Sequence, residues 1–198
     1  GMKVMMVSSA GKAIRFDESE ARPMGRDTTG VHGIRIDVAG GDRVLGMEIA
    51  PDDSDLFVIT ERGYGKRTKV TEYTEHHRGG GGMSTIKMTD KKGMIAAMKI
   101  INEKHEMMIV SEEGVVIRVK AGDISELSRA TQGVKVMNVD ASDRVVAVAR
   151  VAAGKKKKKE IIEGQTELLT EEISGQMKTE VPADVEDDIE EDEIDTTD

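Results

Sequence analysis

The chain has 198 residues, a net charge of −9 and no cysteine, which excludes disulfide bonds and thiolate zinc sites. Its charge is divided unevenly, because residues 2–151 carry 23 Lys and Arg against 22 Asp and Glu, whereas residues 152–198 carry 6 against 16. No run of about 18 apolar residues occurs, so we expect no membrane-spanning helix and no membrane partner. The asymmetry predicts a folded module at 3–151 followed by a Lys-run linker and acidic tail at 152–198.

Short apolar runs bounded by Gly, Asp and Ser predict four strands in each of three units. A hairpin opens each unit, with expected strands at 3–8 and 12–16, at 56–60 and 64–70, and at 107–111 and 115–119. Two further strands follow in each unit, at 31–36 and 44–49, at 84–88 and 94–100, and at 134–139 and 145–151. Four-stranded units of about 50 residues have the size of propeller blades. We therefore predict an all-β, propeller-like array of three four-stranded blades at about 3–52, 53–103 and 104–151.

One frame of glycines and arginines recurs in all three units. A glycine is followed by an arginine four residues later, by a second arginine eleven residues after that, and by a second glycine after four more. The three copies are Gly11, Arg15, Arg26 and Gly30; Gly63, Arg67, Arg78 and Gly82; and Gly114, Arg118, Arg129 and Gly133. Steps of 52 and 51 residues indicate a repeat array in which neighbouring units complete each other's core.

The repeated arginines predict a phosphate-binding arc, because equivalent positions of a propeller lie on one rim. Guanidinium groups bind phosphate oxygens bidentately, so the arc would hold a bent nucleic-acid backbone without reading its sequence. The expected contacts are Lys12, Arg15, Arg26, Lys66, Arg67, Lys69, Arg78, Arg118, Lys120 and Arg129.

An alternative role for the arginines stays open at this point. The arginines could instead pair with the acids between them and join neighbouring blades; those acids are Asp17, Glu18, Glu20, Glu72, Glu75, Asp123 and Glu126.

A run of four glycines follows Arg78. Gly79, Gly80 and Gly82 would let backbone N–H groups converge on a phosphate, as in anion-binding nests, although a flexible hairpin loop explains the same composition. The four histidines lack the spacing of metal ligands, and no nucleophile stands with a base in a recognisable pattern. The sequence therefore predicts no catalytic residue and no metal site.

Three segments resemble the C-terminal domain of the DNA gyrase A subunit. They are GYGKRT at 63–68, MGR with TGVHGIR at 24–35, and RATQGV at 129–134. The resemblance covers residues 3 to about 151 and implies a β-pinwheel, a propeller-like ring of six four-stranded blades that wraps DNA around its basic perimeter. This chain would hold the last three blades and the tail. The HHRGGGG segment at 76–82 looks like a degenerate copy of the family's gyrase box, keeping Arg78, Gly79, Gly80 and Gly82.

The resemblance also implies a function. It implies non-specific binding and chiral wrapping of double-stranded DNA, in support of ATP-dependent negative supercoiling by a heterotetramer of gyrase A and gyrase B subunits in the bacterial cytoplasm. ATP and Mg²⁺ would bind elsewhere in that holoenzyme. The family's catalytic tyrosine belongs to another region, so no catalytic residue is carried over. The motifs do not separate gyrase from topoisomerase IV.

Two further alternatives remain open from the sequence. The first is a propeller module that binds another protein through its loops. The second is an independent enzyme, for which no catalytic constellation is present. The tail carries 16 acids and, after Lys159, a single lysine. It is expected to be disordered from 181 onward, and it would either compete with DNA for the basic rim or keep the chain soluble.

Overall fold

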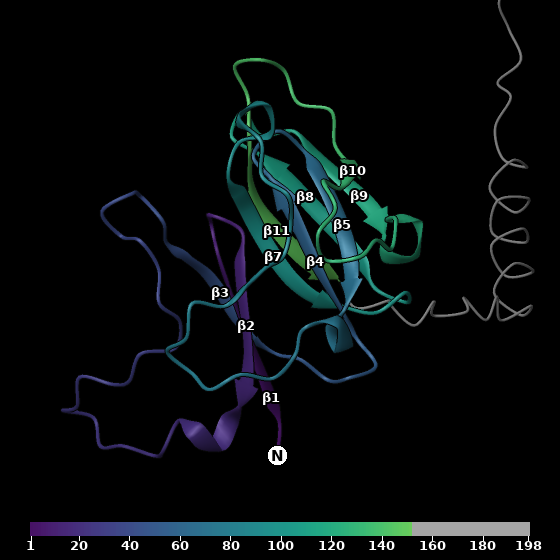
Figure 1. Ribbon diagram of the computed structural model, residues 1–198. Coiled ribbons are helices and arrows are strands. Elements are labelled where there is room, and N and C mark those ends of the chain that lie inside the picture. Colours follow the sequence, from purple (N-terminus) through teal and green to yellow (C-terminus); the bar gives the residue numbers. More distant parts are fainter. Residues whose placement is uncertain (152–198) are drawn as a thin grey trace, which may run out of the picture. The chain divides into compact units, whose positions relative to one another are not determined.

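The computed structural model describes residues 1–151, and these residues form an all-β fold as predicted (Figure 1). Its strands are β1 (Lys3–Ser8), β2 (Lys12–Asp17), β3 (Val44–Ile49), β4 (Asp55–Thr60), β5 (Tyr64–Lys69), β6 (Met83–Ser84), β7 (Ile95–Ile101), β8 (Glu106–Ser111), β9 (Val116–Lys120), β10 (Val134–Lys135) and β11 (Val145–Val151). Four single-turn 3₁₀ helices connect them: η1 (Glu18–Glu20), η2 (Val70–Glu72), η3 (Asp90–Lys92) and η4 (Ala121–Asp123). No helix in this part of the chain has the length and hydropathy of a membrane span. The predicted linker and tail at 152–198 lie outside the described residues.

The strands form three antiparallel sheets, with the orders β3-β1-β2-β6, β10-β5-β4-β7 and β11-β8-β9. The short strands β6 and β10 each lie in the repeat that follows the sheet they complete, so the sheets cross the repeat boundaries. The four strands expected in the third repeat all form, but β10 pairs with the second sheet, so the third sheet has three strands within residues 1–151. In this part of the chain, no fourth strand pairs with the edge strand β9.

The exchanged strands are short and approach the preceding sheet closely. Gly82 has φ +65°, and a Cβ there would lie 2.7 Å from the carbonyl oxygen of Ala13 in the preceding repeat. The next residue, Thr85, donates from its N to Gly11 O at 2.9 Å, in the hairpin turn before β2, so the strand pairing ends where β2 begins. The strand expected at 84–88 is thus reduced to Met83–Ser84, and the one expected at 134–139 is reduced to Val134–Lys135.

The strand predicted at 31–36 is wrong, since these residues form no strand. Their equivalents in the second and third repeats, β6 and β10, pair with the sheet of the preceding repeat. The segment instead contacts the glycine run of the second repeat, with Gly79 N donating to Gly33 O at 2.6 Å and Arg35 N donating to Gly80 O at 2.8 Å.

The hydrophobic core lies between the sheets. All six residues of β4 are buried, and neighbouring side chains on this strand point to opposite faces. Leu56 and Val58 pack with Met5 and Val7 of the first sheet. Phe57 and Ile59 instead join a cluster shared with the third sheet, whose other members include Met107 and Ile109. Each repeat therefore buries its apolar side chains mainly against its neighbours, which makes the contacts between repeats decisive for stability.

Candidate nucleic-acid interface

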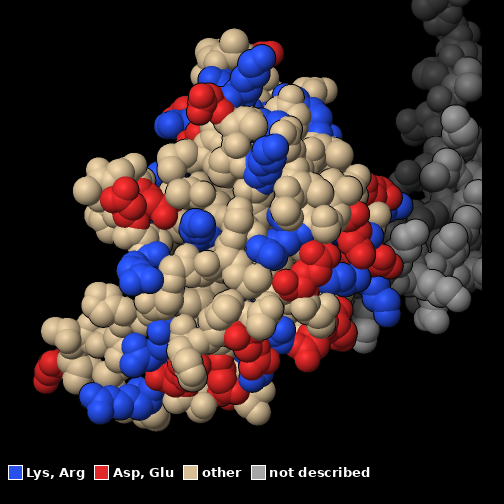
Figure 2. All heavy atoms as spheres, viewed as in Figure 1, with Lys and Arg blue, Asp and Glu red and all other residues tan. Residues whose placement is uncertain are grey.

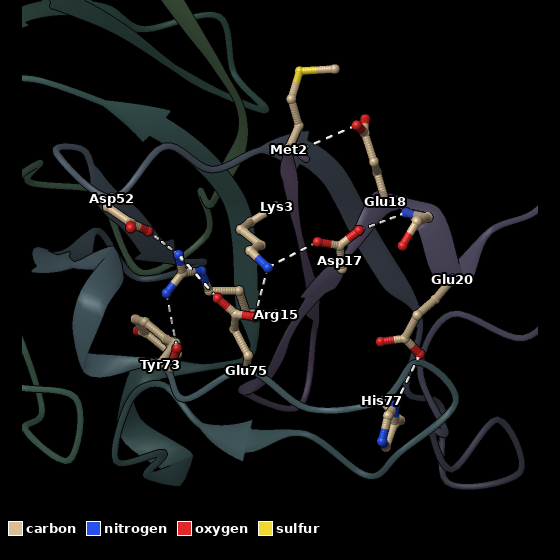
Figure 3. Close-up of polar contacts among 11 residues, drawn as sticks. Met2, Lys3, Arg15, Asp17, Glu18, Glu20, Asp52, Tyr73, Glu75 and His77 are labelled. Carbon is tan, nitrogen blue, oxygen red and sulfur yellow. Dashed lines mark hydrogen bonds and ion pairs between the residues drawn. The ribbon is translucent and has the colours of Figure 1, made fainter.

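The first arginine of the frame is buried between repeats. Arg15 lies on β2, is only 6% exposed, and forms an ion pair with Asp52 (Figure 3). Its Nη2 also lies 4.0 Å from Oε1 of Glu75, whose other carboxylate oxygen is 2.7 Å from Lys3 Nζ. Glu75 belongs to the second repeat, so one carboxylate ties two basic residues of the first repeat to the next unit.

Arg67 repeats this arrangement one unit later. It is 7% exposed, and its guanidinium lies 2.8 Å from Asp55, 3.1 Å from Glu126 and 3.2 Å from Glu103. Its Nε donates to the carbonyl oxygen of Ile124 at 2.8 Å. Burial alone would lower the pKa of Arg67, but the hydrogen bond to Asp55 and the three carboxylate charges raise it.

The alternative of ion pairs between blades is therefore confirmed for Arg15 and Arg67. Both are joined by an ion pair and a backbone bridge to a glutamate of the following repeat, Glu75 and Glu126 respectively. Lys69 belongs to the same network, since its Nζ lies 2.9 Å from Asp55 and 3.1 Å from Glu126. A phosphate could reach Arg15 or Arg67 only by breaking these pairs, so the interface proposed below excludes them.

Arg118 occupies the same frame position in the third repeat but has a different environment. Its side chain is 62% exposed, and its one ion-pair partner among residues 1–151 is Glu106 of its own hairpin. Lys120, two residues further along β9, is also exposed. For these two residues, contact with DNA stays a prediction.

The second arginine of the frame fastens its loop to the preceding repeat. Arg78 donates from Nε to the carbonyl oxygen of Glu20 at 2.9 Å and from Nη1 to that of His32 at 3.1 Å. Arg129 donates from Nη1 to the carbonyl oxygen of Ser84 at 2.8 Å. His32 and Ser84 occupy equivalent positions, so this contact recurs from unit to unit. Arg26, in the first repeat, lies exposed in a loop.

The glycine run has a packing role in the structure. The N–H of Gly79 is already donated to Gly33 O, and a Cβ on Gly80 would lie 3.5 Å from the Cδ1 of Ile14. Gly82 supplies the close approach to β2 described above. These contacts account for Gly79 and Gly82 without an anion-binding nest, so the interface proposed below excludes these two glycines. The 3.5 Å at Gly80 is an ordinary packing distance, so for Gly80 contact with DNA stays a prediction.

Lys66 is fully buried and also joins two repeats. Its Nζ donates to the carbonyl oxygens of Ser128 at 2.6 Å and Arg129 at 2.8 Å, and to the hydroxyl of Thr131 at 3.2 Å. The two equivalent positions hold apolar side chains, Ile14 and Ile117, which is the signal in the sequence that this lysine lies in the core. Burial lowers its pKa from 10.5 to about 8.

This lowered pKa predicts how the stability depends on pH. Between about pH 8 and 10.5 the unfolded chain binds more protons at Lys66 than the folded chain does, so this residue's contribution to stability rises with pH. Below pH 8 the ammonium is charged in both states and its burial penalty is constant. Raising the pH from 7.5 to 9.5 should therefore favour wild type over Lys66→Met by about 2 kcal/mol.

Urea unfolding at the two pH values measures this difference. Comparing each variant with wild type removes the titration of all other groups. The control is Lys12→Met, which changes an exposed lysine and should show no such drift. Parallel pH profiles for wild type and Lys66→Met would contradict the assignment.

Several basic side chains, most of them outside the arginine frame, lie exposed or half-buried along the joints between repeats. We call the following six the basic strip: Lys12, Arg62, Lys87, Lys92, Arg129 and Lys135. Among residues 1–151 none of the six forms an ion pair with Asp or Glu. On the face shown in Figure 2, Lys and Arg side chains stand apart from acidic ones in the middle, whereas Asp and Glu gather along the lower right.

Strand pairing and hydrogen bonds connect the members of the strip. Lys12 is the register partner of Ser84, whose carbonyl oxygen accepts from Arg129. Lys87 N donates to Thr131 O at 3.0 Å, Lys92 Nζ donates to Gln132, and Lys135 Nζ donates to the carbonyl oxygen of Arg62 at 3.1 Å. Four members were not predicted from the sequence, because they do not recur in the frame: Arg62, Lys87, Lys92 and Lys135.

Comparison with known proteins identifies the family. The family model for the DNA gyrase C-terminal domain, a beta-propeller, matches residues 3–51, 54–102 and 105–152. The chain belongs to the DNA gyrase C-terminal domain family. The DNA gyrase A subunit of Staphylococcus epidermidis is 39% identical over 150 residues, which is 75% of this chain and 17% of that protein. The equivalent protein of Staphylococcus aureus shows the same identity and coverage.

Solved structures agree with this membership. A structure of the DNA gyrase A C-terminal domain superposes with a TM-score of 0.69 at 29% identity, covering 75% of this chain and 50% of that chain. The C-terminal domain of DNA topoisomerase IV shares the fold with a TM-score of 0.71 at 24% identity, covering 88% of this chain and 51% of that chain. The chain thus spans about half of these solved domains and 17% of the curated gyrase subunits.

In this member of the gyrase C-terminal domain family, contacts between repeats explain the recurring frame. The first glycine closes each hairpin with φ between +77° and +88°. The first arginine forms an ion pair with a glutamate of the next repeat in two of the three repeats. The second arginine donates a hydrogen bond to a carbonyl oxygen of the preceding repeat in two of the three repeats. The exposed basic side chains without acidic partners are therefore the ones available for a ligand.

Proposed function

We propose that this chain binds double-stranded DNA without sequence preference and holds it in a chiral bend, as part of the A subunit of a bacterial DNA gyrase. Wrapping of this kind would support ATP-dependent negative supercoiling by a holoenzyme of gyrase A and gyrase B subunits. ATP and Mg²⁺ would act in other parts of that assembly, and the bacterial cytoplasm is the compartment that this function requires. Family membership supports the proposal, and the named relatives are gyrase subunits.

The observation that carries the proposal is the contrast between two groups of basic side chains. One group, with Arg15, Lys66 and Arg67, is buried and has partners within the protein. The other group is the basic strip, which is free of carboxylate pairs among the described residues and follows the joints from the first repeat to the third. Lysines and arginines placed along such a path match a phosphate backbone, which carries a regular row of negative charges.

Salt-dependent DNA binding tests this function. We expect the 198-residue chain to bind unrelated duplexes with equal affinity, and log K should fall linearly with log salt concentration by about 0.9 per neutralised phosphate. Changing Lys12 and Lys87 to Gln should flatten this slope by about 2. Ligation of nicked circles in the presence of the chain should shift linking number in one direction only.

Two outcomes would contradict the proposal. One is the absence of binding at low salt. The other is binding that survives moderate salt unchanged, which is the behaviour expected of a propeller module that recognises another protein.

A further inference from the structure

Tyr64 holds two lysines from different elements against its ring. It is the first residue of β5, and the Nζ of Lys92 lies 4.6 Å from its ring centroid. The Nζ of Lys135 lies 4.8 Å from the same centroid. Lys92 ends η3 in the second repeat, whereas Lys135 lies on β10 in the third repeat. The ring face carries partial negative charge and attracts ammonium groups, so it holds two like charges close together.

Neutral oxygen atoms fix both ammonium groups further. Lys92 donates to the carbonyl oxygen of Gln132 at 3.1 Å and to its side-chain Oε1 at 3.0 Å. Lys135 donates to the carbonyl oxygen of Arg62 at 3.1 Å. No carboxylate takes part in these contacts. An ammonium has three donors, so both lysines keep at least one donor beyond them.

The surroundings of the pair are also held in place. Arg62 donates from Nη1 to the carbonyl oxygens of Ala141 at 2.7 Å and Asp143 at 2.9 Å, which fixes the loop before β11. Lys66 holds the 128–131 loop through the hydrogen bonds described above, and that loop leads directly to Gln132. Preorganised charges bind an anion with less loss of side-chain entropy than mobile lysines do.

We propose that Lys92 and Lys135, held on Tyr64, form a clamp for the phosphate backbone of one DNA strand where it passes from the second repeat to the third. This inference rests on the proposed function. Two fixed positive charges that form no ion pair within residues 1–151 suit two phosphates of one strand, and lysine binds phosphate as a point charge. Because the two lysines come from different repeats, DNA held here also bridges the joint between them.

The test compares matched double variants of the 198-residue chain by salt-dependent binding to a duplex of arbitrary sequence. Lys92→Gln with Lys135→Gln should flatten the salt slope by about 2 and weaken binding at least about tenfold at about 0.1 M salt. The control, Arg43→Gln with Lys104→Gln, removes the same charge from two exposed residues that form no ion pair among residues 1–151, and it should leave the slope unchanged. Tyr64→Leu keeps both charges, so it should keep the slope while weakening binding about two- to fivefold.

The outcomes separate the clamp from the function itself. If wild type does not bind DNA, the proposed function fails. If wild type binds and the double variant behaves like its control, the clamp alone is wrong. Acetylation of the wild-type chain with and without DNA needs no variant: Lys92 and Lys135 should be protected by DNA and Lys104 should not. Equal acetylation, or protection by polyglutamate but not by DNA, would overturn the clamp.

Discussion

Gly63→Ala is expected to destabilise the fold by about 3–5 kcal/mol, which is a large fraction of the stability of a small domain. Gly63 has φ +77°, a conformation that costs a residue with a Cβ about 1–2 kcal/mol. A Cβ there would also lie 2.1 Å from the carbonyl oxygen of Met137 in the third repeat. That backbone must move, and its movement breaks the hydrogen bonds that Val136 N and Met137 N donate to Gly63 O at 2.9 and 3.2 Å.

The third repeat supplies a matched control for this substitution. Gly114 occupies the same frame position with φ +88°, but no neighbouring atom of residues 1–151 lies within 4 Å of the position its Cβ would take. Gly114→Ala should therefore show only the conformational cost of about 1–2 kcal/mol. Urea unfolding followed by circular dichroism measures both. Equal midpoints for the two variants would show that the contact between Gly63 and Met137 does not hold the repeats together.

Much of the fold follows from local patterns in the sequence. The hairpins were predictable because each has an apolar run on both sides of a glycine at a turn, and β1, β2, β4, β5, β8 and β11 lie within a residue or two of their expected positions. The exchange of β6 and β10 was not predictable, since it depends on how closely Gly82 and Gly133 approach the preceding sheet. The expected strand at 31–36 failed for the same reason, because a strand of this kind forms only on a neighbour's edge.

The candidate site was harder to predict than the fold. Equivalence of Arg15, Arg67 and Arg118 was visible in the sequence, and acids that pair with the first two were visible as well. The sequence does not show which partner each arginine binds, because the number of acidic and basic residues does not tell whether a guanidinium group contacts a phosphate or a glutamate. The contact of Tyr64 with Lys92 and Lys135 joins residues far apart in the chain, so no periodic signal marks it.

Arg67→Met is expected to cost about 3–5 kcal/mol, because it removes the partner of a buried charge. Asp55 is 2% exposed and would keep only Lys69 as a cationic neighbour. Arg118→Met changes the equivalent residue of the third repeat, where the pair with Glu106 is largely exposed and should contribute less than about 1 kcal/mol. Adding Asp55→Asn to Arg67→Met should recover part of the loss, since the uncompensated carboxylate is then neutral.

Arg15 and Arg67 hold neighbouring repeats together, and we propose that other basic side chains bind the DNA. The difference in unfolding free energy between Arg67→Met and Arg118→Met tests this division of roles most directly. The structure predicts that Arg67→Met loses at least about 2 kcal/mol more than Arg118→Met. Unchanged stability of Arg67→Met, accompanied by weaker DNA binding, would contradict this division and return Arg67 to the DNA interface.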